Sequence, residues 1–187
     1  MKNKHIARRK FIQYSAAGLP LAASSGSLAG EDSNSLPESP DRNDSHVSTQ
    51  ADVLVVGGGT AGTIAAIQAA RTGARTILIE RGSQLGGTTT TGGVAFPGLF
   101  DAWGKQIIAG IGWELVQSAV ELDKGSVPDF SKVPERHWQN QVHVNQFVYA
   151  LLAEEAAVDA GVMIAYYEFP LSVEKTGDGW MVQCVGP

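Results

Sequence analysis

The residues with the clearest capacity for chemistry are three glycines and one carboxylate: Gly57, Gly59, Gly62 and Glu80. The glycines have the spacing Gly-x-Gly-x-x-Gly, which suits a strand-to-helix turn around a bound pyrophosphate. Glu80 follows Gly62 by eighteen residues, where a carboxylate can accept hydrogen bonds from both hydroxyls of a ribose. A carboxylate there also repels a 2′-phosphate, so the spacing predicts a dinucleotide site that disfavours NADP.

Each position in this motif has its own steric or electrostatic task. Gly57 permits the tight turn, Gly59 lets the backbone approach the phosphates without a Cβ, and Gly62 lets the helix pack closely on the strand. Thr60 and Ala61 open the helix, where unpaired N–H groups and the helix dipole attract an anion. We therefore expect these five residues to bind the cofactor phosphates.

The motif requires a β-α-β unit around it, and the sequence supplies one. Residues 51–56 form a short β-branched run typical of a buried parallel strand, and residues 63–70 are helix formers that stop at Gly73. A second strand over residues 74–79 ends directly at Glu80. A lone glycine motif is a weak signal, but its agreement with the flanking elements disfavours a chance glycine turn.

The segment after Glu80 distinguishes flavin proteins from simple NAD dehydrogenases. Residues 81–93 read Arg-Gly-Ser-Gln-Leu-Gly-Gly-Thr-Thr-Thr-Thr-Gly-Gly, with paired glycines and hydroxyls where a simple dehydrogenase usually runs into its next helix. This pattern resembles the FAD-dependent oxidoreductases, and residues 92–100 and 102–116 resemble an exported branch of that family. The resemblance covers nearly all of residues 51–185.

The resemblance implies FAD as the cofactor and assigns roles to further residues. Gly86, Gly87 and Thr88 are expected to line the FAD pyrophosphate and approach the flavin. Glu80 and Arg81 are expected to hold the adenosine end.

The same family passes the chain beside the adenine just after the third strand. That strand is predicted here over residues 162–167, and residues 168–170 follow it. Because Pro170 has no N–H, this stretch offers one backbone donor fewer, and we expect at most a weak adenine contact there.

The remaining sequence predicts two helices and a hairpin. Apolar spacing predicts helices over residues 105–122 and 144–160, separated by a polar surface excursion over residues 124–141. Strands over residues 171–175 and 180–185 form the hairpin. The expected fold is α/β: a Rossmann-like FAD/NAD(P)-binding three-layer fold with a parallel sheet and a β-hairpin crossover, incomplete at its C-terminus.

Few other side chains suggest chemistry. His137 and His143 are candidate proton carriers on the substrate side, although a loop histidine is more often solvated. Cys184 is expected to be a small buried hydrophobe, and Trp103 and Trp113 are expected to pack rather than react. A single cysteine excludes an internal disulfide and, in practice, a structural zinc site. No metal site and no catalytic acid or base is predicted.

Residues 1–29 are expected to be an export signal. Residues 8–11 read Arg-Arg-Lys-Phe, which resembles the twin-arginine pattern, an apolar Ala-rich stretch follows over residues 14–23, and residues 27–29 offer a small-residue cleavage site. The apolar stretch has about half of the roughly 20 residues that span a bilayer, so no stable membrane span is expected. A basic disordered tail and an uncleaved membrane anchor are the alternatives.

The export signal bears on function, because the twin-arginine route moves proteins that are already folded. A cofactor loaded in the cytoplasm would then reach the periplasm or the cell exterior through the twin-arginine export machinery. Residues 30–50 are rich in Ser, Pro, Asp and Asn and are expected to be a flexible linker. Residues 51–187 remain as the N-terminal, truncated part of an FAD-binding domain.

The body of the chain is acidic. From Gly30 onward, nine Lys or Arg stand against all nineteen Asp or Glu of the chain, so no basic patch suits nucleic acid.

The sequence therefore predicts an exported FAD-dependent oxidoreductase, with a small-molecule substrate and an electron acceptor that the residues do not identify. One alternative is an NAD-linked or flavin monooxygenase half-domain, although no second nucleotide motif is visible. Another is a non-catalytic, truncated nucleotide-binding fragment of a longer flavoenzyme. The complete motif over residues 53–80 disfavours a structural or adhesion domain. A sheet without its later strands would also leave an unpaired edge.

Overall fold

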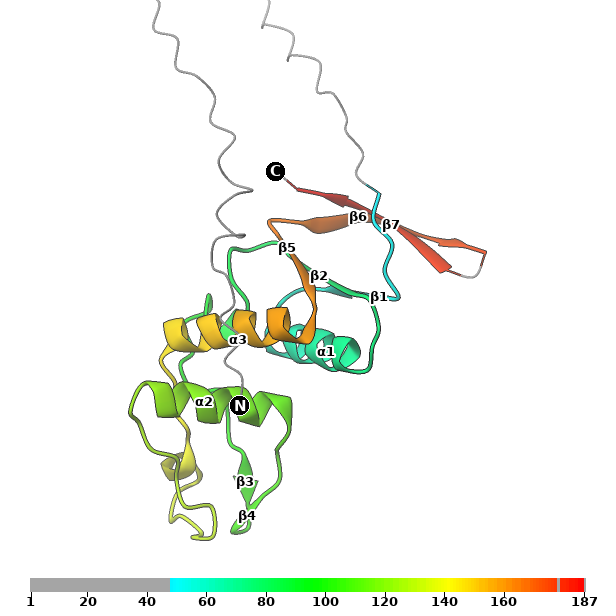
Figure 1. Cartoon of the computed structure of the whole chain (residues 1–187). Helices are drawn as coiled ribbons and strands as arrows, with labels where there is room; N and C mark the ends of the chain where they lie inside the picture. Colours follow the sequence, from blue (N-terminus) through cyan, green and yellow to red (C-terminus); the bar gives the residue numbers. More distant parts are fainter. Residues whose placement is uncertain (1–47, 178, 187) are drawn as a thin grey trace, which may run out of the picture. The chain divides into compact units, whose positions relative to one another are not determined.

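A three-stranded parallel sheet forms the centre of the described chain (Figure 1). The computed structural model describes residues 48–177 and 179–186, so the predicted export signal and most of the linker lie outside this part. The strands are β1 (Val53–Val56), β2 (Thr76–Glu80) and β5 (Met163–Tyr166), in the order β1-β2-β5. β1 and β5 fall within their predicted ranges, and β2 extends one residue beyond its predicted range to include Glu80.

Three helices accompany this sheet. Helices α1 (Thr60–Arg71) and α3 (Gln146–Ala160) pack together on one side of the strands, and α2 (Ile111–Leu122) packs on both of them (Figure 1). The connection from β1 to β2 runs through α1, whereas the connection from β2 to β5 contains α2 and α3. The arrangement is the expected Rossmann-like α/β fold.

The first helix buries one narrow face. Thr63, Ala66 and Ile67 are its buried residues, spaced i, i+3 and i+4 along one face. Gly73, with φ at 94°, lies two residues beyond the end of α1 and turns the chain back toward β2. The prediction of a helix over residues 63–70 is confirmed, and the structure extends it by one turn at the N-terminal end.

The third helix is bounded by clear capping residues. Asn145 accepts hydrogen bonds from the N–H groups of Phe147 and Val148 through its side chain, and Gly161 ends the helix in the left-handed conformation at φ 90°. The predicted helix over residues 144–160 is therefore confirmed to within two residues.

One core joins the sheet to all three helices. Its centre contains Leu78 of β2, Ile67 of α1, Val116 of α2 and Tyr149 of α3, all of which are almost fully buried. An aromatic cluster extends this core outward. Its ring centroids lie 4.7 Å apart between Phe100 and Trp113 and 5.5 Å apart between Trp113 and Phe130.

The prediction of one helix over residues 105–122 is wrong for its first six residues. β3 (Asp101–Ala102) and β4 (Lys105–Gln106) instead form a short antiparallel pair. The turn between these strands places Trp103 at φ 52° and Gly104 at φ 71°, and Gly110 at φ 85° precedes α2. Because positive φ angles are incompatible with a continuing right-handed helix, α2 begins only at Ile111.

A long antiparallel hairpin follows the sheet. Its strands, β6 (Phe169–Thr176) and β7 (Gly179–Val185), begin earlier than the sequence predicts, and Pro170 stands opposite Cys184 within them. Figure 1 shows the hairpin on the side of the sheet away from α1 and α3, which supplies the third layer. Several of its apolar side chains are exposed: Phe169, Leu171, Val173, Trp180, Met181 and Val185.

The excursion between α2 and α3 is largely exposed, as predicted, and contains one short 3-10 helix (His137–Asn140). Across residues 48–177 and 179–186, none of the helices is long and apolar enough to cross a membrane.

Trp113 and Trp103 differ in burial and should therefore contribute very differently to the free energy of unfolding. Trp113 is 8% exposed within the aromatic cluster, whereas Trp103 is 87% exposed, so the expectation that Trp103 packs is wrong. We expect Trp113→Ala to lower the free energy of unfolding by about 3–5 kcal/mol, because it empties a large buried volume. Trp103→Ala is the matched control and should change it by less than about 0.5 kcal/mol. Urea unfolding of both variants, followed by circular dichroism, measures the difference; equal losses would contradict the packing described here.

Candidate functional site

The turn from β1 into α1 has the geometry of a phosphate-binding glycine turn. Gly57 takes φ 93°, which only glycine adopts without strain. A Cβ at Gly62 would collide with the carbonyl oxygen of Gly57, so helix and turn touch directly. A Cβ at Gly59 would meet nothing within 4 Å and would project into open space beside the backbone. The three glycines thus have distinct tasks, and the space at Gly59 is where a ligand can approach the main chain.

The N-termini of α1 and α3 differ in their capping. Helix α1 starts at Gly59 without any side-chain cap and has no acidic residue in its first turn. Helix α3 is closed by the Asn145 side chain, which accepts from two backbone N–H groups at 3.1 and 3.4 Å. An anion is therefore attracted to the positive end of α1, whereas the corresponding donors of α3 are already satisfied.

Glu80 lies at the carboxyl end of β2 and joins two backbone loops. One carboxylate oxygen accepts from the Gly58 N–H at 2.6 Å and the other from the Gly82 N–H, also at 2.6 Å. These charge-assisted bonds fix the carboxylate beside the glycine turn. Each oxygen has a second acceptor position, so the two oxygens can still accept from a pair of ribose hydroxyls.

A second glycine segment closes against the first. Gly86 donates to the carbonyl oxygen of Gly58 at 2.8 Å and forms an isolated parallel bridge with Gly59. A Cβ at Gly87 would lie 2.9 Å from the Cα of Gly59, and Gly87 takes φ 52°. The chain then forms a short 3-10 helix (Gly87–Thr89). Gly87 is therefore required for the close approach of the two segments, whereas Gly86 is required by its φ of 100° and by the Thr90 side chain beside it.

Three threonine hydroxyls tie these segments to the helix and to one another. Thr63 donates to the Gly58 carbonyl at 2.9 Å, Thr60 to the Gly86 carbonyl at 3.1 Å, and Thr90 to the Leu85 carbonyl at 2.6 Å. Thr63 and Thr90 are both buried.

Thr63 and Thr90 were not among the residues predicted from the sequence. Each is a polar residue at a position that the surrounding pattern would bury, and this is the signal that could have identified it. Thr63, for example, lies three residues before the buried Ala66 on the same helix face. The hydroxyl of Thr60, a residue predicted at the phosphates, donates to the Gly86 carbonyl and so connects α1 to the second glycine segment.

Two tyrosines link α3 to the same region. Burial raises the pKa of Tyr149, and a hydrogen bond with the Thr60 side chain partly offsets that increase. The Tyr166 hydroxyl donates to a Glu154 carboxylate oxygen at 2.7 Å. Burial, this bond and the charges of Glu154 and Glu80 raise the pKa of Tyr166 well above its usual range. Both phenols therefore remain protonated near neutral pH, and Tyr166 acts as a hydrogen-bond donor.

The structure brings most of the predicted cofactor residues together. Gly57, Gly59 and Gly62 at the first turn meet Gly86 and Gly87 of the second segment. Glu80 bonds to the residue between the first two of these glycines.

The other predicted residues are less engaged. Ala61, Arg81 and Thr88 are exposed at the edge of this cluster, and the Arg81 side chain makes no hydrogen bond within the described residues.

The stretch expected near the adenine has its backbone donors engaged. Tyr167 donates its N–H to the Gly82 carbonyl at 3.3 Å, and Glu168 donates to the Glu80 carbonyl at 3.1 Å. Pro170 lies within β6 and has no N–H. The Tyr167 and Glu168 N–H groups are thus engaged within the chain, and an adenine contact in this stretch stays a prediction.

The other candidate side chains lie apart from the glycine cluster. His137 is exposed at the start of its 3-10 helix, and His143 is exposed with its ring 5.7 Å from the Phe96 ring in an edge contact. Cys184 is half-buried in β7 rather than fully buried, and burial raises the pKa of its thiol. Among the residues that the structure describes, no group of three His, Cys, Asp or Glu could hold a metal ion.

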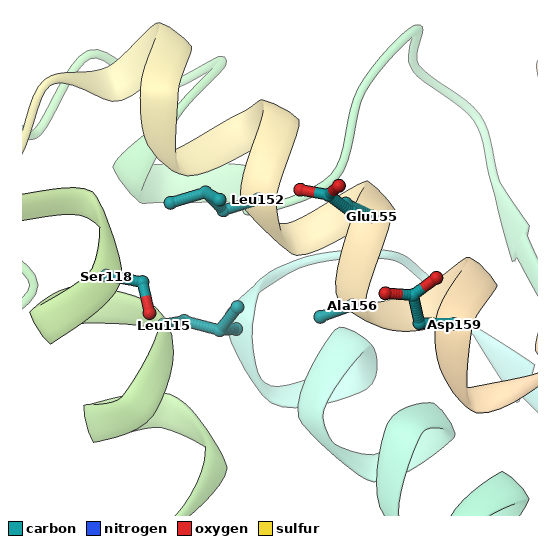
Figure 2. Close-up of a pocket in the computed structure, with 6 residues that line it drawn as sticks. All are labelled: Leu115, Ser118, Leu152, Glu155, Ala156 and Asp159. Carbon is teal, nitrogen blue, oxygen red and sulfur yellow. The ribbon is translucent and has the colours of Figure 1, made fainter. Parts of the chain in front are cut away.

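A shallow groove between α2 and α3 lies outside the glycine cluster. It has a volume of about 160 Å³, and Figure 2 shows Leu115 and Ser118 of α2 facing Leu152, Glu155, Ala156 and Asp159 of α3. None of its lining residues belongs to the predicted cofactor site.

Alanine substitutions at two glycines should separate ligand binding from folding. Gly59→Ala meets no protein atom, so we expect unchanged stability but an FAD affinity reduced by about tenfold or more, because the methyl group enters the ligand space. Gly62→Ala collides with the Gly57 carbonyl and should lower the thermal midpoint itself. Thermal unfolding with and without FAD distinguishes the two effects. A Gly59→Ala variant that binds FAD like the wild type would place the ligand elsewhere.

Comparisons with solved structures give matches of limited similarity. CabE, an aromatic hydroxylase from angucycline biosynthesis, is 22% identical with a TM-score of 0.48; the match covers 74% of this chain and 28% of that chain. The OxyS anhydrotetracycline hydroxylase from Streptomyces rimosus is 22% identical with a TM-score of 0.46, and the match covers 73% of this chain and 28% of that chain. The thioredoxin reductase of Lactococcus lactis is 19% identical with a TM-score of 0.41, and the match covers 72% of this chain and 31% of that chain. The chain thus spans about a third or less of the length of these proteins.

A comparison with protein families is decisive. The profile of the family described as FAD dependent oxidoreductase matches residues 52–186, which include the whole of the glycine cluster and both strands of the hairpin. The match therefore extends over almost all of the chain that the structure describes. This chain belongs to the FAD-dependent oxidoreductase family.

Proposed function

We propose that this chain binds the ADP part of FAD at the β1–α1 turn and contributes it to an oxidoreductase acting on a small-molecule substrate. The observation that carries this proposal is the cradle of main-chain groups around Gly59. It combines an uncapped helix N-terminus, open space at the Gly59 Cβ and a fixed carboxylate at Glu80. Together these match the needs of a dinucleotide with an anionic centre and a vicinal diol.

Each part of the cradle suits one part of the ligand. The N–H groups at the start of α1 would bind the pyrophosphate, and the Glu80 carboxylate would accept the ribose hydroxyls through its unused acceptor positions. Gly86, Gly87 and the exposed Thr88 would line the pyrophosphate on the flavin side. When bound, the isoalloxazine supplies the hydride or electron transfer, while the chain supplies binding and electrostatics.

The charge at the ribose end favours FAD over a nucleotide with a 2′-phosphate. Glu80 cannot turn away easily, because two backbone N–H groups hold its oxygens at 2.6 Å. A 2′-phosphate would then lie beside a fixed negative charge and be repelled.

We also propose that the chain is exported by the twin-arginine route to the periplasm or the cell exterior. Support comes from the Arg-Arg-Lys-Phe sequence at residues 8–11, the short apolar stretch that follows and the cofactor expected for the body. A folded, loaded flavoprotein is the kind of cargo for which this route is suited.

A nucleotide-binding role without turnover is the second candidate. It is favoured by His137 and His143, the candidate proton carriers, which are both exposed and whose side chains form no hydrogen bond with the glycine cluster among the described residues. In that case the chain would retain flavin and show no oxidation of any substrate.

The proposal is tested by flavin retention on the full chain. We expect the purified protein, mixed with FAD and passed through gel filtration, to keep the absorbance bands of the flavin. Glu80→Gln should weaken FAD binding by about tenfold to a hundredfold, because the amide has one acceptor oxygen where the carboxylate has two. Glu114→Gln, an exposed acid paired with Arg71 on the surface, is the matched control and should bind normally. A folded wild-type chain that retains no flavin would exclude the proposed site.

Export has its own test. Replacing both Arg8 and Arg9 by Lys keeps the charge of the segment but removes the arginine pair, so we expect the precursor to accumulate in the cytoplasm. Lys2→Arg with Lys4→Arg is the charge-matched control and should be exported. Cell fractionation measures both, and equal export of the two variants would contradict the twin-arginine assignment.

A further inference from the structure

We propose that Thr63 is a positioning residue that aims the Gly59 N–H at the bound pyrophosphate. This inference rests on the proposed function, because it concerns the same cradle. It adds a role for a buried side chain that reaches the ligand only through the backbone.

Thr63 fixes the carbonyl groups on both sides of Gly59. Its side-chain hydroxyl donates to the Gly58 carbonyl at 2.9 Å, and its own N–H donates to the Gly59 carbonyl at 2.9 Å. The side chain is 1% exposed, so water does not compete for either bond. Both peptide groups that flank Gly59 are therefore oriented by one residue of α1.

The Gly58 carbonyl is held from a second direction as well. Gly86 donates its N–H to the same oxygen at 2.8 Å, so this oxygen uses both of its acceptor positions within the protein. The Gly58 N–H is bound to Glu80 at 2.6 Å. Gly58 is thus connected to β2, to the second glycine segment and to α1.

Because a peptide group is planar, fixing the Gly58 carbonyl also fixes the direction of the Gly59 N–H. The chain has no cis peptide bond among its described residues, so the Gly58–Gly59 peptide is trans and planar. In a trans peptide the C=O of one residue and the N–H of the next point in opposite directions. With the Gly58 carbonyl held inward, the Gly59 N–H must point outward.

The outward direction is the open one. Within the part of the chain that the structure describes, the Gly59 N–H has no hydrogen-bond acceptor, and a Cβ at Gly59 would meet nothing within 4 Å. Burying a threonine hydroxyl on the helix face that also carries Ala66 and Ile67 costs free energy, unless the hydroxyl forms a hydrogen bond such as the one to the Gly58 carbonyl.

The test uses the full chain and compares three variants. Thr63→Val keeps the shape but replaces the hydroxyl by a methyl group that cannot donate and needs more room beside the carbonyl. We expect FAD to bind about tenfold more weakly, the effect of one lost hydrogen bond on an orienting contact. Thr63→Ser restores the donor and should bind within about twofold of the wild type.

The matched control is Thr76→Val. Thr76 is also buried, and its hydroxyl donates to the Ala74 carbonyl at 3.0 Å, but it lies at the opposite end of β2 from Glu80. Its replacement should cost a similar amount of stability and leave FAD affinity unchanged. A loss of affinity in both valine variants would therefore reduce the role of Thr63 to stability and overturn the proposal.

A second readout does not depend on the ligand. In ¹H–¹⁵N spectra of the unliganded chain, the Gly59 amide should shift in Thr63→Val and return toward its wild-type position in Thr63→Ser. An unchanged Gly59 amide in Thr63→Val would overturn the proposal. If the wild type itself does not bind FAD, the proposed function fails, and the Gly59 shift still decides whether Thr63 orients the peptide. Should Thr63→Val not fold, Thr63→Ala removes the same donor and takes its place.

Discussion

The hydrogen bonds from the Gly58 and Gly82 N–H groups to the Glu80 carboxylate are the interaction on which the site depends. They connect the end of β2 to the turn after β1 and to the loop after β2 itself, at 2.6 Å in each case. Because an ionised acceptor strengthens both bonds, the carboxylate is held rigidly where it is needed. The position of the glycine turn relative to the sheet follows from this anchor, and so does the position of the second glycine segment through its contact with Gly58.

From that anchor outward, the site is built mainly from the main chain. Side chains act chiefly as ties: threonine hydroxyls satisfy the carbonyls that face inward, which leaves N–H groups to face outward. The difference between α1 and α3 has the same logic. The Asn145 side chain occupies two N–H groups at the start of α3, whereas no side chain caps α1, so the backbone donors of α1 stay available to an anion.

Much of this could be predicted from the sequence, because the β-α-β unit is local. The strand, the glycine turn, the helix and Glu80 are close together along the chain, and each is indicated by residue types within a few positions of one another. The hairpin of β3 and β4 could not be predicted, since apolar residues such as Ile107 and Ile108 continue the helical spacing across it. The positive φ at Trp103 and Gly104 forms the turn of this hairpin, and the positive φ at Gly110 prevents the helix from starting earlier than Ile111. Thr63 and Thr90 escaped attention for a related reason: their partners are carbonyl groups, which no sequence pattern displays.

The open space at the Gly59 Cβ has a consequence for how such a site changes over generations. Recognition by backbone amides does not depend on the identity of most side chains nearby, so substitutions can accumulate around the cradle without altering what it recognises. The exceptions are the glycines where a single added carbon fills the space or collides with another loop, and the two side chains that fix the main chain, Glu80 and Thr63. Loss of binding by random substitution is therefore expected to be abrupt and confined to these few positions, while the rest of the surrounding sequence drifts freely.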